Sequence, residues 1–206
     1  MNRRDRKKKS ARRKAFRDPK KRFLVVCEGL VTEPDYLKGF SRWVKNPRVE
    51  VEIPKTHGVP LTVVSTAIDL KEENRRHAKR EKDDNLLFDE VWCLHDVDEH
   101  PHLTEARQLA ESNDIQVAIS NPCFELWVLL HFREQPGAQH RKKLSRLVGE
   151  HLPEYEKALR FEELEKGYED AVTRARRLDE QAEKRDEEGV NPSTGVYRLT
   201  EKIRQV

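Results

Sequence analysis

Three carboxylates follow two apolar runs and could together bind a divalent cation. Glu28 follows the run 22–27, and Asp96 and Asp98 follow the run 90–94. Both runs are continuous rather than alternating, which is typical of strands covered on both faces of a sheet. Carboxylates at i and i+2 project from the same side of a strand. Mg²⁺ and Mn²⁺ prefer such oxygen ligands, so the spacing predicts a metal site.

An Asp-x-Asp pair is weak evidence by itself, because aspartates at strand ends are common and often cap the following helix. Two features favour a site in this chain. Ligands of open α/β sheets bind beyond the carboxyl ends of the strands. Three clustered carboxylates also repel one another strongly unless a cation lies between them. We therefore expect Glu28, Asp96 and Asp98 to share one edge of a sheet.

The expected elements predict an α/β fold with a mainly parallel sheet of about four strands flanked by helices. Strands are expected at residues 22–27, 49–53, 90–94 and 115–119. Helical patterns separate them, and strand–helix–strand succession implies right-handed crossovers. After about residue 135 the pattern is helical only. We expect three parts, which are a basic arm (1–21), an α/β core (22–135) and a helical extension packed on that core (136–206).

Four helices have recognisable starts or apolar patterns. Thr32 is expected to cap the first helix, and the apolar run 124–132 predicts a buried helix. Ser193 or Thr194 is expected to cap the last helix. Apolar residues recur every three or four positions over 161–182. This stripe predicts a long helix that either packs across the domain or forms the seam of a homodimer.

Positive charge is concentrated at the N-terminus. The formal net charge is +3, but residues 1–22 hold 13 Lys and Arg against two Asp, and the remainder holds 28 basic against 36 acidic residues. Clustered positive charge without apolar periodicity is typical of disordered segments that contact nucleic-acid phosphates. The residues expected to make these contacts are Arg12, Arg13, Lys14, Lys20, Lys21 and Arg22. A solubility tail, or a segment that contacts ribosomes or acidic partners, is the alternative.

Composition argues against several classes of protein. No apolar run approaches the roughly 20 residues of a membrane span. No apolar segment follows the basic N-terminus closely enough for a signal peptide. Cys27, Cys93 and Cys123 lack the spacing of a disulfide framework or a zinc site. We therefore expect a cytoplasmic protein without membrane contact.

Four further polar residues near the expected strand ends are candidates for substrate binding. Ser120 and Asn121 precede a proline, and they either cap an ordinary helix or present backbone N–H groups to a phosphate. His95 precedes the first aspartate and could orient a carboxylate or contact phosphate. His100 lies in a proline loop near the expected site, where it either touches substrate or is simply exposed.

Four segments, in chain order, resemble the RloB-like family. They are VCEGLVTEPDY (26–36), HDVDEH (95–100), AISNPCFELW (118–127) and NPST (191–194). The resemblance extends from about Arg22 to the C-terminus. It implies a bacterial protein of restriction-modification and phage-defence loci, often encoded beside an AAA/ABC-type ATPase. It also implies a core similar to the Toprim domain of topoisomerases, primases and OLD nucleases.

The resemblance implies roles for matching residues. In Toprim enzymes the glutamate after the first strand acts as general acid/base or metal ligand, which corresponds to Glu28. The Asp-x-Asp pair holds Mg²⁺, which corresponds to Asp96 and Asp98. Nuclease relatives use a further acidic residue for a second metal. Glu125 and Glu33 are the candidates for that ligand, with a looser correspondence.

We therefore expect a nuclease that depends on Mg²⁺ (or Mn²⁺) and hydrolyses phosphodiester bonds of DNA or RNA. One or two divalent ions would stabilise charge on the phosphoryl oxygens and activate a water molecule. The resemblance implies an effector of anti-phage defence by abortive infection, held in check by its ATPase partner. The alternative is a catalytically weak Toprim-like module that binds nucleic acid or the ATPase as a sensor or adaptor.

Overall fold

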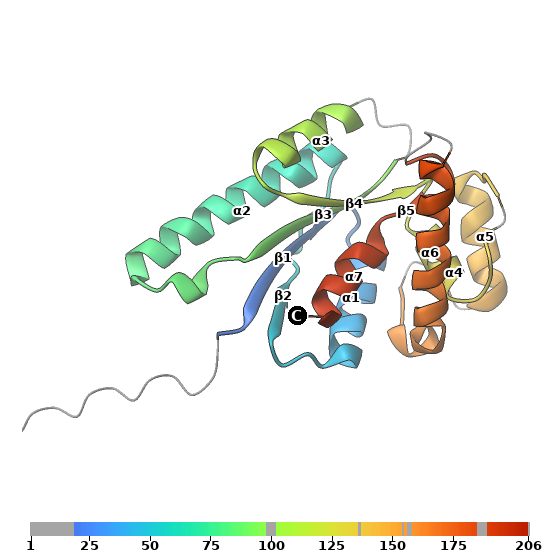
Figure 1. The fold of residues 1–206 in the computed structure, drawn as a ribbon, viewed down its shortest axis with the longest axis horizontal. Helices are drawn as coiled ribbons and strands as arrows, with labels where there is room; N and C mark the ends of the chain where they lie inside the picture. Colours follow the sequence, from blue (N-terminus) through green and yellow to red (C-terminus); the bar gives the residue numbers. More distant parts are fainter. Residues whose placement is uncertain are drawn as a thin grey trace, which may run out of the picture.

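A five-stranded sheet lies at the centre of the fold (Figure 1). The structure is a computed structural model that describes residues 19–97, 102–135, 137–153, 155, 158–184 and 189–205. The strand order is β2-β1-β3-β4-β5, in which β1 to β4 are parallel and β5 is antiparallel to β4. The strands are β1 (Lys21–Cys27), β2 (Val49–Glu52), β3 (Glu90–Asp96), β4 (Gln116–Asn121) and β5 (Ser193–Thr194). The predicted α/β fold with a mainly parallel sheet is confirmed.

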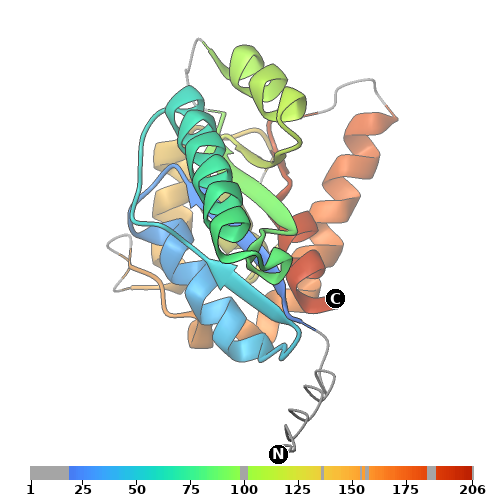
Figure 2. The same cartoon turned by 90° about the vertical axis from the view of Figure 1, so that its left-hand side faces the viewer.

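Helices connect and cover the strands. The α-helices are α1 (Thr32–Val44), α2 (Pro60–Glu81), α3 (Leu103–Ser112), α4 (Glu125–Leu130), α5 (Arg141–His151), α6 (Tyr168–Glu183) and α7 (Val196–Gln205). Short 3-10 helices occur at η1 (Asp84–Leu86), η2 (Phe161–Glu163) and η3 (Glu165–Gly167). Turned by 90°, the structure shows α2 in front of the strands, which it covers, with α6 and α7 side by side away from it (Figure 2). None of the helices in the described part of the chain combines the length and hydrophobicity that crossing a bilayer requires.

The two faces of the sheet bury different helices because side chains alternate along each strand. On β1, Val25 and Cys27 belong to the core formed with α1 and α4 to α7, whereas Leu24 and Val26 belong to the core formed with α2 and α3. All four side chains are fully buried. Burial on both faces explains why this strand has a continuous apolar sequence. The C-terminal helices complete the larger of the two cores.

Aromatic rings fill the larger core. The Tyr36 ring makes edge contacts with Trp127 and Phe161, at centroid separations of 6.1 and 5.2 Å. His131 lies among them, with Nδ1 2.9 Å from the Trp127 carbonyl oxygen and Nε2 3.2 Å from the Tyr36 hydroxyl. Burial lowers the pKa of His131 to about 4, so this side chain is a neutral core residue.

Several predicted boundaries were wrong. Helix α1 begins at Thr32, so the cap position falls on Val31, which has no hydrogen-bonding side chain, and Thr32 is the first helical residue rather than the cap. Residues 193–194, expected to cap the last helix, also form an additional strand, β5, which the sequence did not predict. The Thr194 hydroxyl does also accept a hydrogen bond from Val196 N, at 3.5 Å. The expected helix 124–132 is shorter, since α4 covers six residues.

The apolar stripe over 161–182 is buried within the chain. It begins in the 3-10 helices η2 and η3, and the α-helical part starts only at Tyr168. Tyr168, Ala171, Ala175 and Leu178 pack into the larger core. The stripe therefore packs across the domain, and its burial removes the basis for predicting a homodimer seam here.

Part of the predicted basic arm belongs to the sheet. Lys21 is the first residue of β1, and the exposed Lys20 precedes it. Arg22 lies inside β1, where its guanidinium donates to the Leu86 carbonyl oxygen, pairs with Glu52 at 3.2 Å and lies over the Phe88 ring at 4.7 Å. Arg22 is thus a structural residue. Arg12, Arg13 and Lys14 lie outside the described residues.

Candidate functional site

A carboxylate-lined cavity of about 320 Å³ lies beyond the carboxyl ends of β1 and β3. Among the described residues, four acidic residues line it, which are Glu28, Glu33, Asp96 and Glu125, and Arg141 is the one basic residue in this part of its lining. They come from the β1–α1 turn, α1, β3, α4 and α5. Ligands of parallel α/β sheets bind at this edge. We call it the carboxylate cavity.

Strand pairing brings Glu28 and Asp96 together. Parallel pairing of β1 with β3 sets Cys27 opposite Leu94, and Glu28 N donates to the Leu94 carbonyl oxygen at 2.9 Å. The backbone N–H of Asp96 donates to Glu28 Oε2 at 3.0 Å. This bond fixes the Glu28 carboxylate at the end of β3. The two sequence-predicted residues are therefore adjacent, while Asp98 lies outside the described residues.

Glu33 lies over the turn that follows β1. It is 6% exposed and lies in the first turn of α1. A Cβ atom at Gly29 would overlap its carboxylate, so the glycine leaves the space that this side chain occupies. Burial raises the pKa of Glu33, and the negative charges of Glu125 and Glu28 raise it further, against the lowering effect of backbone hydrogen bonds that include one from Gly29. The side chain is accordingly a candidate proton acceptor.

Glu125 is held by two hydroxyl groups. It is the first residue of α4 and is 3% exposed. Its Oε1 accepts hydrogen bonds from Tyr155 Oη at 3.2 Å and Ser145 Oγ at 3.4 Å. Burial and the Glu125 charge both raise the pKa of Tyr155, so the phenol stays protonated and able to donate. The bond from Ser145, which lies in α5, holds this helix, and with it Arg141, beside the carboxylates.

The donor set of the carboxylate cavity has the chemistry that a hard divalent cation requires. Glu28, Glu33, Asp96 and Glu125 offer oxygen ligands. Burial raises the pKa of Glu33 most, and the charges of Glu125 and Glu28 that raise it further are ones that a cation would balance. Among the residues that the structure describes, no group of three His, Cys, Asp or Glu side chains is arranged to hold a metal ion. The residues thus fit a cation by type and location, and the predicted Mg²⁺ (or Mn²⁺) remains a prediction.

The predicted substrate-binding residues have other contacts. Ser120 is buried, and its Oγ is 2.9 Å from Thr194 Oγ1, where it ties β4 to β5. Asn121 Nδ2 donates to the Gly189 carbonyl oxygen at 2.9 Å. His95 is buried in β3, and strand alternation directs it to the face opposite Asp96. None of these three lines the carboxylate cavity, and His100 lies outside the described residues.

Sequence reasoning did not identify Arg141, Ser145 or Tyr155. Arg141 opens the basic start of α5, whose N-terminal Lys142 N–H donates to His140 Nδ1 at 3.3 Å. Basic residues at the start of a helix are common on solvated surfaces, so the residue type alone does not indicate that Arg141 belongs to a site. Only the tertiary packing of α5 against α4 reveals their proximity to the carboxylates.

The cysteines do not provide a nucleophile. Cys27, Cys93 and Cys123 are all buried. Burial raises the pKa of the Cys93 thiol to about 12, and it raises that of Cys123 together with the charges of Glu125 and Asp96. A thiol that remains protonated is a poor nucleophile.

The raised pKa of Glu33 predicts a pH-dependent stability difference. Because the pKa of Glu33 is raised in the folded state, ionisation of this buried side chain lowers the free energy of unfolding. This loss is absent at pH values below the unfolded-state pKa and fully present at pH values above the folded-state pKa. We expect Glu33→Gln to raise the melting temperature at about pH 8, in the presence of EDTA, and the gain to vanish towards about pH 4. Thermal unfolding of both proteins across this range measures the difference.

Glu111→Gln is the matched control, because Glu111 is exposed on α3. We expect this substitution to change the melting temperature little at any pH. A Glu33→Gln protein that is no more stable than the wild type at about pH 8 would contradict the assigned burial and repulsion.

Comparison with known proteins identifies a family. A family model described as RloB-like protein matches residues 23–203. No curated protein and no solved structure gives a significant match. The match includes every described residue of the carboxylate cavity.

Proposed function

Because the chain belongs to the RloB-like protein family and gathers four carboxylates at the carboxyl end of a parallel sheet, we propose that it is a divalent-metal-dependent nuclease. The observation that carries this proposal is the convergence of Glu28, Glu33, Asp96 and Glu125, with Arg141 beside them, on one cavity. A relationship to Toprim enzymes, implied by the sequence motifs, is part of the proposal.

The proposed roles follow from the contacts. Glu28 and Asp96, together with Asp98, would hold Mg²⁺ or Mn²⁺, and Glu125 would complete the acidic environment. When bound, the ion would supply charge stabilisation at the phosphoryl oxygens and a water of lowered pKa. Arg141 would orient the scissile phosphate through its guanidinium N–H groups. Glu33, whose pKa is raised by burial, would accept the proton of the attacking water.

The direct test is cleavage by the purified full-length chain. Labelled single- and double-stranded DNA and RNA are incubated with the protein in the presence of Mg²⁺, Mn²⁺ or EDTA. We expect shortened products with either metal and none with EDTA. Absence of cleavage of all four substrates under every metal condition would overturn the nuclease proposal.

One observation favours a second candidate function, in which the protein binds nucleic acid or a partner without cleaving it. Within the described ranges, the acidic side chains do not form a ready three-residue metal site. A sensor or adaptor would need no such site. Metal-independent binding without cleavage in the same assays would support this candidate.

The biological role is proposed from the family. An RloB-like nuclease would act as the effector of anti-phage defence, restrained by an AAA/ABC-type ATPase until infection. The prediction is that expression of the chain alone slows growth of a bacterial host and that co-expression of an AAA/ABC-type ATPase from the same locus relieves the effect. Unimpaired growth in the first experiment would contradict a restrained effector.

A further inference from the structure

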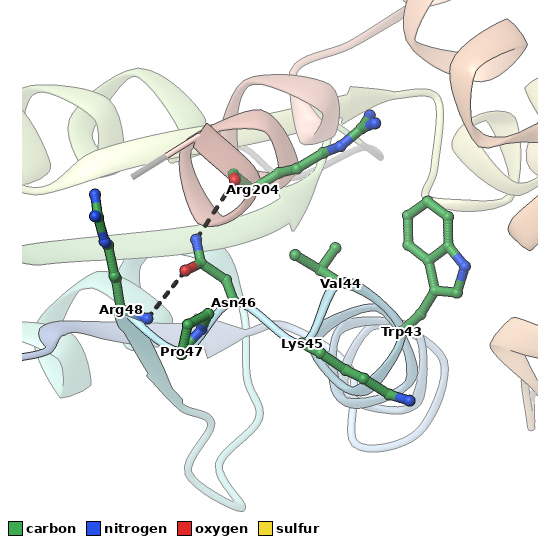
Figure 3. A pocket seen from close by; sticks show the side chains of 7 residues that line it. All are labelled: Trp43, Val44, Lys45, Asn46, Pro47, Arg48 and Arg204. Atoms are coloured by element: carbon green, nitrogen blue, oxygen red, sulfur yellow. Dashed lines mark hydrogen bonds between the residues drawn. The ribbon is translucent and has the colours of Figure 1, made fainter.

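A second cavity lies at the amino end of the sheet, where α1 ends and β2 begins (Figure 3). Its volume is about 490 Å³, and it is lined by residues 43–48 and by Arg204 of α7. Three of these seven residues, Lys45, Arg48 and Arg204, are cationic, and none is acidic. We call it the cationic cavity. It is separated from the carboxylate cavity by the length of β1, about 20 Å for seven residues.

Asn46 holds the cationic cavity in shape. Its Nδ2 donates to the carbonyl oxygens of Ile203 at 2.9 Å and Arg204 at 3.4 Å, and its Oδ1 accepts from Arg48 N at 3.0 Å. Figure 3 shows two of these bonds, of which one joins the α1–β2 connection to Arg204 of α7 and the other lies within the connection, between Asn46 and Arg48. The loop is therefore fixed before any ligand binds, and a preformed site avoids the entropic cost of ordering it.

Two of the three cations lack an acidic partner. In the described part of the chain, no carboxylate oxygen lies within 4.0 Å of the side-chain nitrogens of Lys45 or Arg48, and both residues are exposed. Arg204 differs, because it pairs with Glu169 and lies over the Tyr168 ring at 5.5 Å. A cavity with uncompensated positive charge and no acidic lining residue favours an anionic ligand.

Trp43 adds an aromatic wall. One part of its ring packs against Phe161 and Tyr168, at centroid separations of 5.4 and 5.5 Å, and the residue also lines the cavity. Trp43 is partly exposed, whereas Trp92 and Trp127 are buried. Aromatic rings beside Lys and Arg are the combination by which proteins bind single strands, since bases stack on the ring and phosphates contact the cations.

The basic N-terminal segment joins the fold beside this cavity. Lys21 N donates to the Arg48 carbonyl oxygen at 2.8 Å, and Lys20 and Lys21 are both exposed. Residues 1–18 contribute ten further Lys and Arg against two Asp. The positively charged N-terminal part of the sequence is thus followed by Lys21, whose backbone is hydrogen-bonded to that of Arg48.

We propose that the cationic cavity binds a single-stranded segment of nucleic acid, with phosphates on Lys45 and Arg48 and a base stacked on Trp43. Taking nucleic acid as the ligand rests on the proposed function, but the cavity is distinct from the carboxylate cavity. It would hold the strand at one end of the sheet while the other end contacts a different part of the same molecule.

Binding of a labelled single-stranded oligonucleotide of about 20 nucleotides to the full chain tests the proposal, by fluorescence anisotropy in EDTA at several salt concentrations. We expect Lys45→Glu/Arg48→Glu to bind about tenfold more weakly and to reduce the salt slope by about 1 to 2. Lys79→Glu/Lys82→Glu is the matched control. Lys82 ends α2 in the left-handed conformation, as Lys45 ends α1, and both control residues are exposed.

Tryptophan fluorescence reports the cavity directly. We expect the oligonucleotide to quench the emission of the wild type and Trp43→Phe to lose most of this quenching. Equal loss of affinity in the control variant, or full quenching in Trp43→Phe, would overturn the proposal. A mononucleotide that competes as tightly as the strand would also overturn it, in favour of a free-nucleotide site.

The anisotropy and fluorescence measurements separate this inference from the nuclease proposal, because both report binding and can be made without metal and without cleavage. Binding that depends on Lys45 and Arg48 in a protein that never cleaves would support the cationic cavity and overturn the nuclease. Cleavage accompanied by unchanged binding in Lys45→Glu/Arg48→Glu would overturn the cationic cavity and leave the nuclease in place.

Discussion

Asp96→Asn is expected to lower metal-dependent cleavage by about a thousandfold while leaving the fold in place. Asp96 ends β3 and is 8% exposed, and its backbone N–H donates to Glu28 Oε2. Asparagine has the same shape and keeps this backbone bond, but it removes one of the negative charges expected to hold the cation. Cleavage rates of a labelled substrate at saturating Mg²⁺ measure the effect.

Asp114→Asn is the matched control. Its side chain is 93% exposed, and asparagine tolerates the left-handed backbone found there. We expect wild-type cleavage from this variant. A second measurement is independent of cleavage, because a ligand that binds only the folded state raises the melting temperature. Mg²⁺ should stabilise the wild type and the Asp114 variant more than the Asp96 variant. Cleavage by Asp96→Asn within tenfold of the wild type would contradict the assigned role.

The second large effect concerns stability rather than cleavage. Gly167 precedes α6, and a Cβ atom there would overlap the backbone carbonyl of His131. Backbone cannot move aside as the end of a flexible side chain can. We therefore expect Gly167→Ala to lower the free energy of unfolding by about 3 kcal/mol. Urea unfolding should show a midpoint lower by about 1 M.

Gly149→Ala is expected to have the opposite effect, a higher free energy of unfolding, in the same urea experiment. Gly149 lies within α5, and apart from its chain neighbours and the nearby backbone of its own helix, no heavy atom of the described residues lies within 4 Å of the position that its Cβ would take. Alanine favours helix over glycine, so this variant should be more stable by about 0.5 to 1 kcal/mol. Equal midpoints for the two variants would show that the close approach of α6 to the end of α4 does not limit stability.

The sheet could be predicted from the sequence because its signals are local. Val25 and Val26 face opposite cores, and a strand covered on both sides must be apolar at every position. Parallel order then placed Glu28 and Asp96 at one edge, and the structure brings them together. The strand β5 was not predictable in this way, since two residues are too few to show a period.

The remaining parts of the site depend on contacts between distant segments. Tyr155 reaches Glu125 from 30 residues away, and nothing in the local sequence of either residue indicates the other. Arg22 carried the same charge as the arm but lies beside Glu52 and Leu86 once the strands pair. Ser120 and Asn121 matched the start of a phosphate-binding helix in sequence. In the structure the Ser120 side chain is instead hydrogen-bonded to Thr194 of β5, and that of Asn121 to the Gly189 carbonyl oxygen. The type of each residue indicated what contacts it could make, but the sequence did not indicate which distant residue it contacts.

The segment 193–205 closes the structure at two places. β5 pairs with β4, and α7 contributes Val196, Leu199 and Ile203 to the larger core. Ile203 and Arg204 also supply the carbonyl oxygens that fix Asn46. A chain cut before residue 193 would lose β5, the three apolar side chains of α7 and the carbonyl oxygens that hold Asn46. One truncation would therefore weaken the sheet, the larger core and the cationic cavity together.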